Sequence, residues 1–248
     1  MTRRMTVVWP DNRPFRGRDG RPLRLLAASD EPDPALDETV NRKALEPIDL
    51  VVGSGDLAPD RLAFLADAFH APLVFVRGNH DRGGPWPEPR QLPLASAGFD
   101  DRTVPGLPLF ALPWPSGERE PPLHDERAAW RQVLRLGGGR LLRRGAVPLV
   151  VSHVPPQGAG DTPADPYHRG FNAYRFVLDR LRPALWLHGH TNPAAQKAWQ
   201  ERYGDSTIVN VTGSVLVEIL PPASRPATAP ARNGSGAVTS GSSPEAGR

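Results

Sequence analysis

The chain contains no cysteine among its 248 residues. This absence excludes a disulfide framework, a catalytic thiolate and a cysteine-ligated zinc site, so every metal ligand must be an oxygen or a nitrogen atom. Lysine is almost as scarce: only Lys43 and Lys197 are present, and the other residues counted as Lys and Arg are arginines. We interpret this bias, together with the abundance of proline and glycine, as an effect of genomic composition and derive no function from it.

The chain also lacks a strong excess of charge and a long apolar run. Its 30 Lys and Arg residues stand against 27 Asp and Glu residues without a sustained basic stripe, so there is no nucleic-acid signature. No stretch approaches the roughly 18 consecutive apolar residues of a membrane-spanning helix, and residues 1–11 lack the apolar core of a secretory signal. We therefore expect a cytoplasmic protein without a membrane segment; nothing in the sequence predicts its oligomeric state.

Length and composition favour one large α/β domain followed by a tail. We expect residues 1–22 to form an N-terminal extension that packs on the domain as a short strand or cap. The domain itself is predicted to span residues 23–220. Residues 221–248 are rich in Pro, Ala, Ser and Gly without periodic apolar positions, which predicts a disordered tail.

Short apolar runs punctuated by turn residues predict the strands of this domain. Five of them cover residues 23–28, 48–52, 73–76, 147–151 and 184–187. Three more cover 107–112, 207–211 and 214–220, the last two as a hairpin that closes the fold. Helical spacing of apolar residues predicts helices over 34–45, 59–69, 125–136 and 172–181. The alternation of strands and helices in the first half is typical of parallel βαβ units.

Each of the first five runs ends in a loop that carries a metal-ligand type of residue. In chain order these residues are Asp30, Asp56, Asn79, His153, and the pair His188 and His190. Because open α/β sheets bind ligands beyond the carboxyl ends of their strands, we expect these loops to converge on one site. Carboxylate, amide oxygen and imidazole groups suit ions such as Mn, Fe or Zn.

This ordered series resembles the signature of the calcineurin-like metallophosphoesterases. An Asp after the first strand is followed by Gly-Asp, Gly-Asn-His-Asp, an isolated His and Gly-His, over Asp30 to Asn192, or roughly two thirds of the chain. The resemblance implies a four-layer αββα sandwich, in which helices flank two mixed β-sheets. It also implies a metal-dependent phosphomonoesterase or phosphodiesterase that uses metal-activated water on a phosphorylated small molecule or nucleotide.

The resemblance further implies roles for individual residues. Asp56 would bridge two divalent metal ions about 3.5–4 Å apart. Asn79, His153 and His190 would complete the second metal site. His80 would be the catalytic acid or an electrostatic stabiliser, since the pKa of an unperturbed histidine lies near neutrality, and Asp81 would orient it.

The first metal site departs from the family pattern at two positions. Proline occupies position 32, where the family has the histidine of Asp-x-His, and Asn192 replaces the last histidine of Gly-His-x-His. We therefore expect Asp30 to belong to a weakened, oxygen-rich site in which Asn192 is a weak ligand. Glu31 or Asp33 could substitute, although Glu31 would point to the opposite face of an extended chain. Mn is the favoured metal, with Fe, Zn and Mg as alternatives.

Four further residues are candidate site residues, and each has a functional and a structural interpretation. Arg77 and Arg82 flank the Gly-Asn-His-Asp motif, where they would bind phosphate oxygens or be solvated at the surface. His168 would face substrate or lie at the surface. His188 would be an additional ligand or a packing residue of its loop.

The two altered positions also support a rival function. In this reading the chain is a degenerate member of the same fold that binds a metal or a nucleotide without turnover. The intact His80 and Asp81 pair favours the enzyme instead. A plain Rossmann-like nucleotide binder is disfavoured, because no Gly-x-Gly-x-x-Gly follows the first strand.

Overall fold

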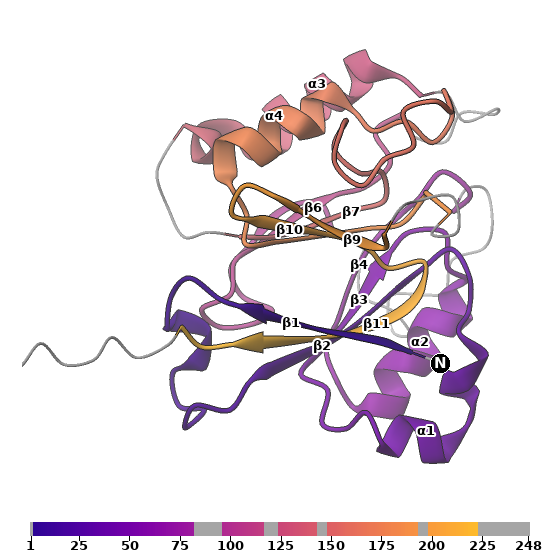
Figure 1. The fold of residues 1–248 in the computed structure, drawn as a ribbon, viewed down its shortest axis with the longest axis vertical. Coiled ribbons are helices and arrows are strands. Elements are labelled where there is room, and N and C mark those ends of the chain that lie inside the picture. Colours follow the sequence, from indigo (N-terminus) through magenta and orange to yellow (C-terminus); the bar gives the residue numbers. More distant parts are fainter. Residues whose placement is uncertain (1, 82–95, 117–123, 143–147, 193–197, 223–248) are drawn as a thin grey trace, which may run out of the picture.

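The computed structural model describes residues 2–81, 96–116, 124–142, 148–192 and 198–222. Two β-sheets stack face to face, with helices on the outer side of each (Figure 1). Buried apolar side chains form one cluster between the sheets and one cluster beneath each helical layer. The predicted four-layer αββα sandwich of two mixed sheets is therefore confirmed. Within the described ranges, no helix is both long and apolar enough to cross a membrane.

The first sheet has five strands in the order β1-β11-β2-β3-β4. Strand β11 is antiparallel to β2 and parallel to β1, whereas β2, β3 and β4 are mutually parallel. The strands are β1 (Arg3–Val8), β2 (Leu23–Ser29), β3 (Leu50–Ser54), β4 (Leu73–Val76) and β11 (Gly213–Leu220). A 3-10 turn (Pro34–Asp37), α1 (Thr39–Lys43) and α2 (Pro59–Phe69) form the helical layer on this side.

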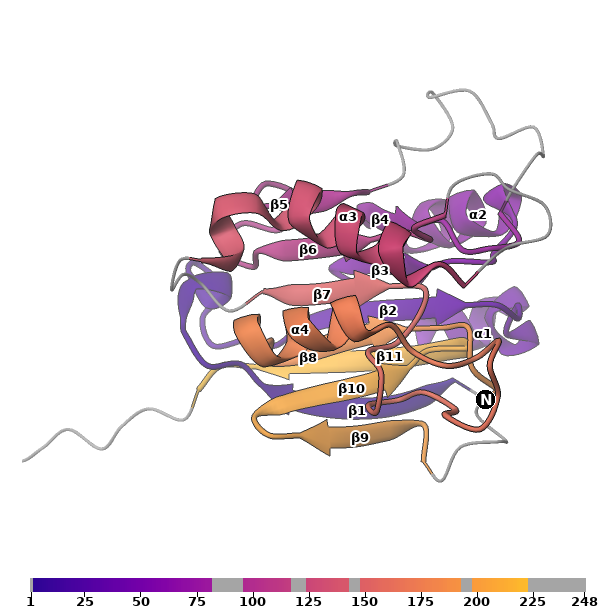
Figure 2. The same ribbon diagram turned by 90° about the horizontal axis from the view of Figure 1, so that it is seen from above.

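The second sheet has six strands in the order β5-β6-β7-β8-β10-β9. Its four central strands are parallel, and β5 and β9 are antiparallel edge strands. The strands are β5 (Gly98–Asp100), β6 (Leu109–Leu112), β7 (Leu149–Ser152), β8 (Leu185–His188), β9 (Gln200–Tyr203) and β10 (Ser206–Asn210). Helices α3 (Glu126–Gly137) and α4 (Asn172–Leu181), with a 3-10 turn at Gly138–Leu141, cover its outer face (Figure 2).

The predicted hairpin of residues 207–211 and 214–220 is wrong. These residues form β10 and β11, which belong to different sheets. The hairpin partner of β10 is β9, whose sequence Gln200-Glu201-Arg202-Tyr203 has no buried residue and hence no apolar signal. The predicted helix over 34–45 is also shorter than expected, because it divides into the 3-10 turn and the five residues of α1.

Residues ahead of β2 contribute to the first sheet. Arg3–Val8 forms its edge strand β1, which pairs with β11 along its whole length, and the indole of Trp9 is fully buried in the core between the sheets. The predicted division at residues 22 and 220 stays a prediction. Most of the predicted tail lies outside the described residues.

Candidate metal centre

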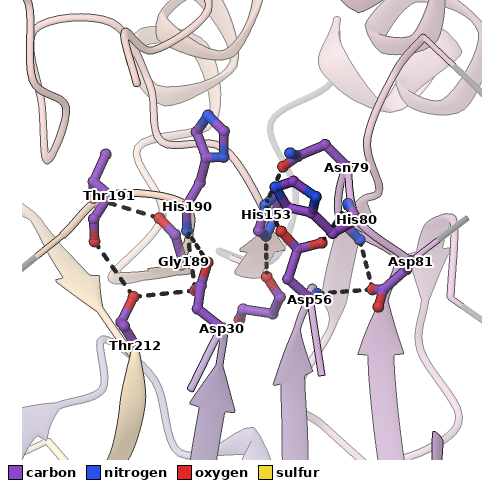
Figure 3. A network of polar contacts seen from close by, with 12 residues as sticks. Asp30, Asp56, Asn79, His80, Asp81, His153, Gly189, His190, Thr191 and Thr212 are labelled. Atoms are coloured by element: carbon purple, nitrogen blue, oxygen red, sulfur yellow. Dashed lines mark hydrogen bonds and ion pairs between the residues drawn. The ribbon is translucent and has the colours of Figure 1, made fainter. Parts of the chain in front are cut away.

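Loops from both sheets meet at one edge of the sandwich (Figure 3). Asp30 follows β2 and Asp56 follows the end of β3 in the first sheet, and His153 follows β7 in the second. Among the described residues, these three form a group whose ligand atoms all lie within 4.8 Å of one another. Residues more than 120 positions apart in sequence are thus brought within reach of one cation, as the sequence predicts.

His153 lies at the centre of this group. Its Nε2 atom is 3.1 Å from Oδ2 of Asp56 and 2.8 Å from Oδ1 of Asn79, while its Nδ1 atom is 2.9 Å from the carbonyl oxygen of Ser54. Burial alone would lower the pKa of His153, but the hydrogen bond and charge of Asp56, with smaller effects of Asp30 and Ser54, raise it to about 9. A proton on Nε2 is therefore shared between two oxygen atoms of metal-ligand type.

His190, in the loop after β8, lies beside this group without being one of its three members. Its ring centroid is 4.9 Å from that of His153, and its backbone N–H donates to both carboxylate oxygens of Asp30 at 3.1 Å. Burial and the neighbouring charge of His153 lower the pKa of His190 to about 3, so the ring is neutral. Its Nε2 atom lies 2.9 Å from the carbonyl oxygen of Tyr167. With the proton on Nε2, Nδ1 keeps the lone pair that a metal ligand needs.

Asp81 links the loops after β3 and β4. Its Oδ2 atom accepts hydrogen bonds of 2.8 Å from the backbone N–H groups of Asp56 and Gly78. Burial and the charge of Asp56 raise the pKa of Asp81 despite these hydrogen bonds. In the described part of the chain no hydrogen bond joins the Asp81 side chain to His80, so its observed contacts position the loops. Orientation of His80 by Asp81 stays a prediction.

His80 lies at the exposed rim of the group. Its backbone N–H donates to Oδ1 of Asp56 at 2.8 Å, which ties the residue to the cluster. Its Nε2 atom is 3.5 Å from the hydroxyl of Tyr167, which accepts a hydrogen bond of 2.6 Å from the Nδ2 group of Asn79.

Two aromatic residues at the site were not predicted from the sequence. Tyr167 contacts Asn79 and His80, and the Trp114 ring packs 5.6 Å from that of His190 and 6.4 Å from that of His153. Neither residue belongs to a ligand motif. The available signals in the sequence were the position of Trp114 two residues after the end of β6 and that of Tyr167 beside His168.

The region of the weakened first site is a cavity of about 390 Å³. Its lining consists of Asp30, Glu31, His168, His190, Thr191, Asn192 and Thr212. Asp30 accepts a hydrogen bond of 3.1 Å from the hydroxyl of Thr212 in addition to those from His190. Pro32 offers no side-chain donor. A larger cavity of about 1280 Å³, beside Arg140 and Arg202, is lined by none of the predicted site residues.

Asp33 does not substitute for the missing histidine. Its carboxylate accepts hydrogen bonds from the backbone N–H of Ala35 at 3.0 Å, from Thr2 at 2.9 Å and from Ser214. Although burial opposes the shift, these bonds lower the pKa of Asp33. The residue therefore caps the 3-10 turn and anchors the first sheet. Glu31, which lines the cavity, is the remaining acidic candidate.

The other predicted residues differ in their relation to the site. His188 is buried with its Nδ1 atom 3.0 Å from the carbonyl oxygen of Gly189 and its Nε2 atom against Gly160, so it does not join the cluster. Burial lowers its pKa to about 4. His168 lines the cavity and pairs with Asp165. Arg77 is half-buried, with substrate contact still a prediction, and Arg82 lies outside the described residues.

Among the following solved structures, the one with a TM-score above 0.5 supports this fold. One solved crystal structure has a TM-score of 0.52 at 15% identity, over 79% of this chain and 95% of that chain. TT1561 of Thermus thermophilus follows with a TM-score of 0.48 at 16% identity, over 77% of this chain and 90% of its own. A predicted phosphoesterase from Streptococcus pneumoniae has a TM-score of 0.34 at 13% identity, over 78% and 74%.

Sequence comparison identifies the family. No curated protein matches the chain. A model of the calcineurin-like phosphoesterase family matches residues 29–193, which is more than half of the chain and contains every residue of the cluster. The protein therefore belongs to the calcineurin-like phosphoesterase family.

Proposed function

We propose that this protein is a metal-dependent phosphoester hydrolase, acting as a phosphomonoesterase or phosphodiesterase on a phosphorylated small molecule or nucleotide. The observation that carries the proposal is the cluster itself. Asp56, Asn79 and His153 turn ligand-type atoms toward one point, and the exposed His80 stands at its rim. A structural ion pair alone would not require an exposed imidazole at this place.

The donor set fits one divalent cation well. The proton that Nε2 of His153 shares with Asp56 and Asn79 occupies a position where a cation would satisfy the same three atoms. His190 adds a neutral imidazole, and Ser54 fixes the other nitrogen of His153 through its carbonyl oxygen. Such a backbone acceptor is the usual support of a ligating histidine.

The donor set of the weakened first metal site, beside Asp30, is poorer. Asp30 and Asp56 supply carboxylates, Asn192 and Glu31 line the adjoining cavity, and Pro32 supplies nothing. Oxygen ligands without imidazole favour hard ions, so we propose Mn as the metal, with Mg, Fe and Zn as the alternatives to test. Divalent cations bound in such a site polarise phosphoryl oxygens and lower the pKa of water.

The chain's own residues would then bind and protonate the substrate. The cavity beside Asp30 accommodates the esterified group, with His168 and Asn192 in its wall. His80 reaches the rim from a backbone anchored on Asp56, where its imidazole can hold or donate a proton to a leaving oxygen. Trp114 closes the inner side of the cluster against His153 and His190.

A second candidate is a member of the fold that binds a metal or nucleotide without turnover. Pro32 and Asn192 favour it, because both replacements weaken the same metal site. The chain should be stripped of metal, reloaded with Mn, Fe, Zn or Mg, and assayed on aryl phosphate monoesters and diesters while the bound ions are counted. Two ions with turnover support the enzyme. One ion without turnover under every loading supports the binder.

His80→Ala tests the proposed proton donor. At saturating metal it should lower turnover by about 10²–10⁴-fold, the usual contribution of a positioned acid. His70→Asn is the matched control, because His70 is an exposed histidine in the left-handed conformation at the end of α2, which asparagine tolerates. Unchanged turnover in His80→Ala would remove the assignment.

A further inference from the structure

Tyr167 touches three residues of the proposed site, although it belongs to none of the motifs. It lies in the loop between β7 and α4. Its hydroxyl accepts a hydrogen bond of 2.6 Å from Nδ2 of Asn79 and lies 3.5 Å from Nε2 of His80. Its backbone carbonyl oxygen lies 2.9 Å from Nε2 of His190. One residue therefore contacts two proposed ligands and the proposed acid.

The hydrogen bond between Tyr167 and Asn79 determines which end of the Asn79 side-chain amide faces the proposed cation. An asparagine side chain carries its acceptor oxygen at one end and its N–H donors at the other. Asn79 is 2% exposed, with Oδ1 directed at Nε2 of His153 and Nδ2 directed at the Tyr167 hydroxyl. A rotation by 180° would turn the N–H donors toward the cation and remove a ligand.

The hydroxyl of Tyr167 has one proton. When this proton is directed toward His80 or toward a bound oxygen, the hydroxyl oxygen is left to accept from Asn79. That arrangement requires the amide nitrogen, not the amide oxygen, to face Tyr167. The backbone carbonyl of Tyr167 orients His190 in a similar way. It accepts a hydrogen bond from the ring proton on Nε2, which leaves the lone pair of Nδ1 for a metal.

We propose that Tyr167 is a positioning residue of the metal centre, whose hydroxyl holds Asn79 with its side-chain oxygen toward the cation. The inference rests on the proposed function, because it assumes a cation between Asp56, Asn79 and His153. It assigns to the loop between β7 and α4 a role that none of the sequence motifs indicates.

Tyr167→Phe removes the hydroxyl and keeps both the ring and the backbone carbonyl that contacts His190. Titration of the metal-free variant with Mn²⁺, monitored by calorimetry, should show an affinity about 10–100-fold lower than that of the unmodified chain. Tyr203→Phe is the matched control. It also removes a hydrogen-bonded hydroxyl, here from a contact of 2.9 Å with Asp179 on the outer face of the second sheet, and should leave Mn²⁺ affinity unchanged.

Asn79→Asp distinguishes positioning from a general loss of structure. A carboxylate has oxygen at both ends, so its orientation no longer decides whether a ligand faces the cation. In the Asn79→Asp background, Tyr167→Phe should therefore change Mn²⁺ affinity by less than about threefold, and the two substitutions should be strongly non-additive. Additive losses would indicate a merely structural role of Tyr167.

The outcomes separate this inference from the proposed function. Wild-type Mn²⁺ affinity in Tyr167→Phe, or an equal loss in both backgrounds, overturns the role of Tyr167 and leaves the metal centre intact. Failure of the unmodified chain to bind any of Mn²⁺, Mg²⁺, Fe²⁺ and Zn²⁺ overturns both proposals. Reduced affinity in Tyr167→Phe that disappears in the Asn79→Asp background supports both.

Discussion

The carboxylate of Asp81 accepts a hydrogen bond of 2.8 Å from the backbone N–H of Asp56, across 25 positions of sequence. The same Oδ2 atom accepts an equally short bond from Gly78. Two strand-end loops are thus held by one oxygen atom, which places Asp56 within reach of His153.

Removal of this oxygen should destabilise the protein. Asp81→Ala leaves two backbone donors without their acceptor, at a cost of about 1–3 kcal/mol for each that stays shielded from water. Asp81→Asn keeps a carbonyl oxygen and should lose much less. Urea unfolding of the metal-free chain measures both. Equal stability of the two variants would show that the hydrogen bonds of Asp81 are not what holds the loops.

Gly78 is required by the close approach of its backbone to Asp56. A Cβ atom at this position would lie 2.1 Å from Oδ1 of Asp56, so Gly78→Ala must displace the carboxylate. We expect a loss of Mn²⁺ affinity of at least about tenfold, since a displaced carboxylate cannot keep its ligand position. Gly139→Ala is the control, because its Cβ would meet no atom within 4 Å. Normal metal binding by Gly78→Ala would contradict the role of Asp56.

Restoring both imidazoles should strengthen the first metal site. Pro32→His combined with Asn192→His adds two nitrogen ligands near Asp30, and metal counting should show a second bound ion at lower free metal concentration. Pro32→Ala combined with Asn192→Ala controls for loss of the native side chains. If occupancy does not rise in the histidine variant, Glu31, which lines the same cavity, is the residue to test next by Glu31→Gln.

Three buried histidines predict the pH dependence of the metal-free protein. Folding raises the pKa of His153 from 6.5 to about 9, because Asp56, Asp30 and the carbonyl oxygen of Ser54 outweigh burial. Its contribution to stability is fully present below pH 6.5 and is lost as the pH rises through about 9. Folding lowers the pKa of His190 to about 3 and of His188 to about 4. Their contributions are present above pH 6.5 and are lost as the pH falls toward those values.

The free energy of unfolding that these groups contribute should therefore be largest near pH 6.5. Urea unfolding in the presence of a chelator, at about pH 5, 6.5 and 9, measures the profile. His153→Gln should abolish the decline on the alkaline side and keep the decline on the acid side. A metal-free wild-type chain that becomes more stable between neutral and alkaline pH would contradict the assignment of His153.

Local patterns in the sequence were sufficient to predict most helices and strands and the order in which the candidate metal ligands follow them. The apolar run Leu73–Val76 and the helical spacing of Pro59–Phe69 correspond to observed elements. Burial of consecutive strand residues gives a continuous apolar run, and burial of one helix face gives a helical period, and both can be read locally. Strand β9 could not be found this way, because an edge strand with exposed side chains has no apolar period.

The partners of individual side chains could not be read from the sequence. Asp33 and Glu31 are both acidic and lie near Asp30, yet Asp33 binds Thr2, Ala35 and Ser214 while Glu31 borders the cavity. Tyr167 has no motif to mark it. Each of these outcomes depends on contacts between segments far apart along the chain, which no local period encodes.

The sequence by itself determined which residue types stand at the carboxyl ends of the strands, and hence that oxygen and imidazole ligands were available to a cation. Only the tertiary structure decided that β10 and β11 part into separate sheets, that Asp81 joins two loops, and that Tyr167 faces Asn79. The physical reason is that secondary structure follows from the burial pattern of neighbouring residues. The geometry of a site, in contrast, follows from the stacking of two sheets whose strands are distant in sequence.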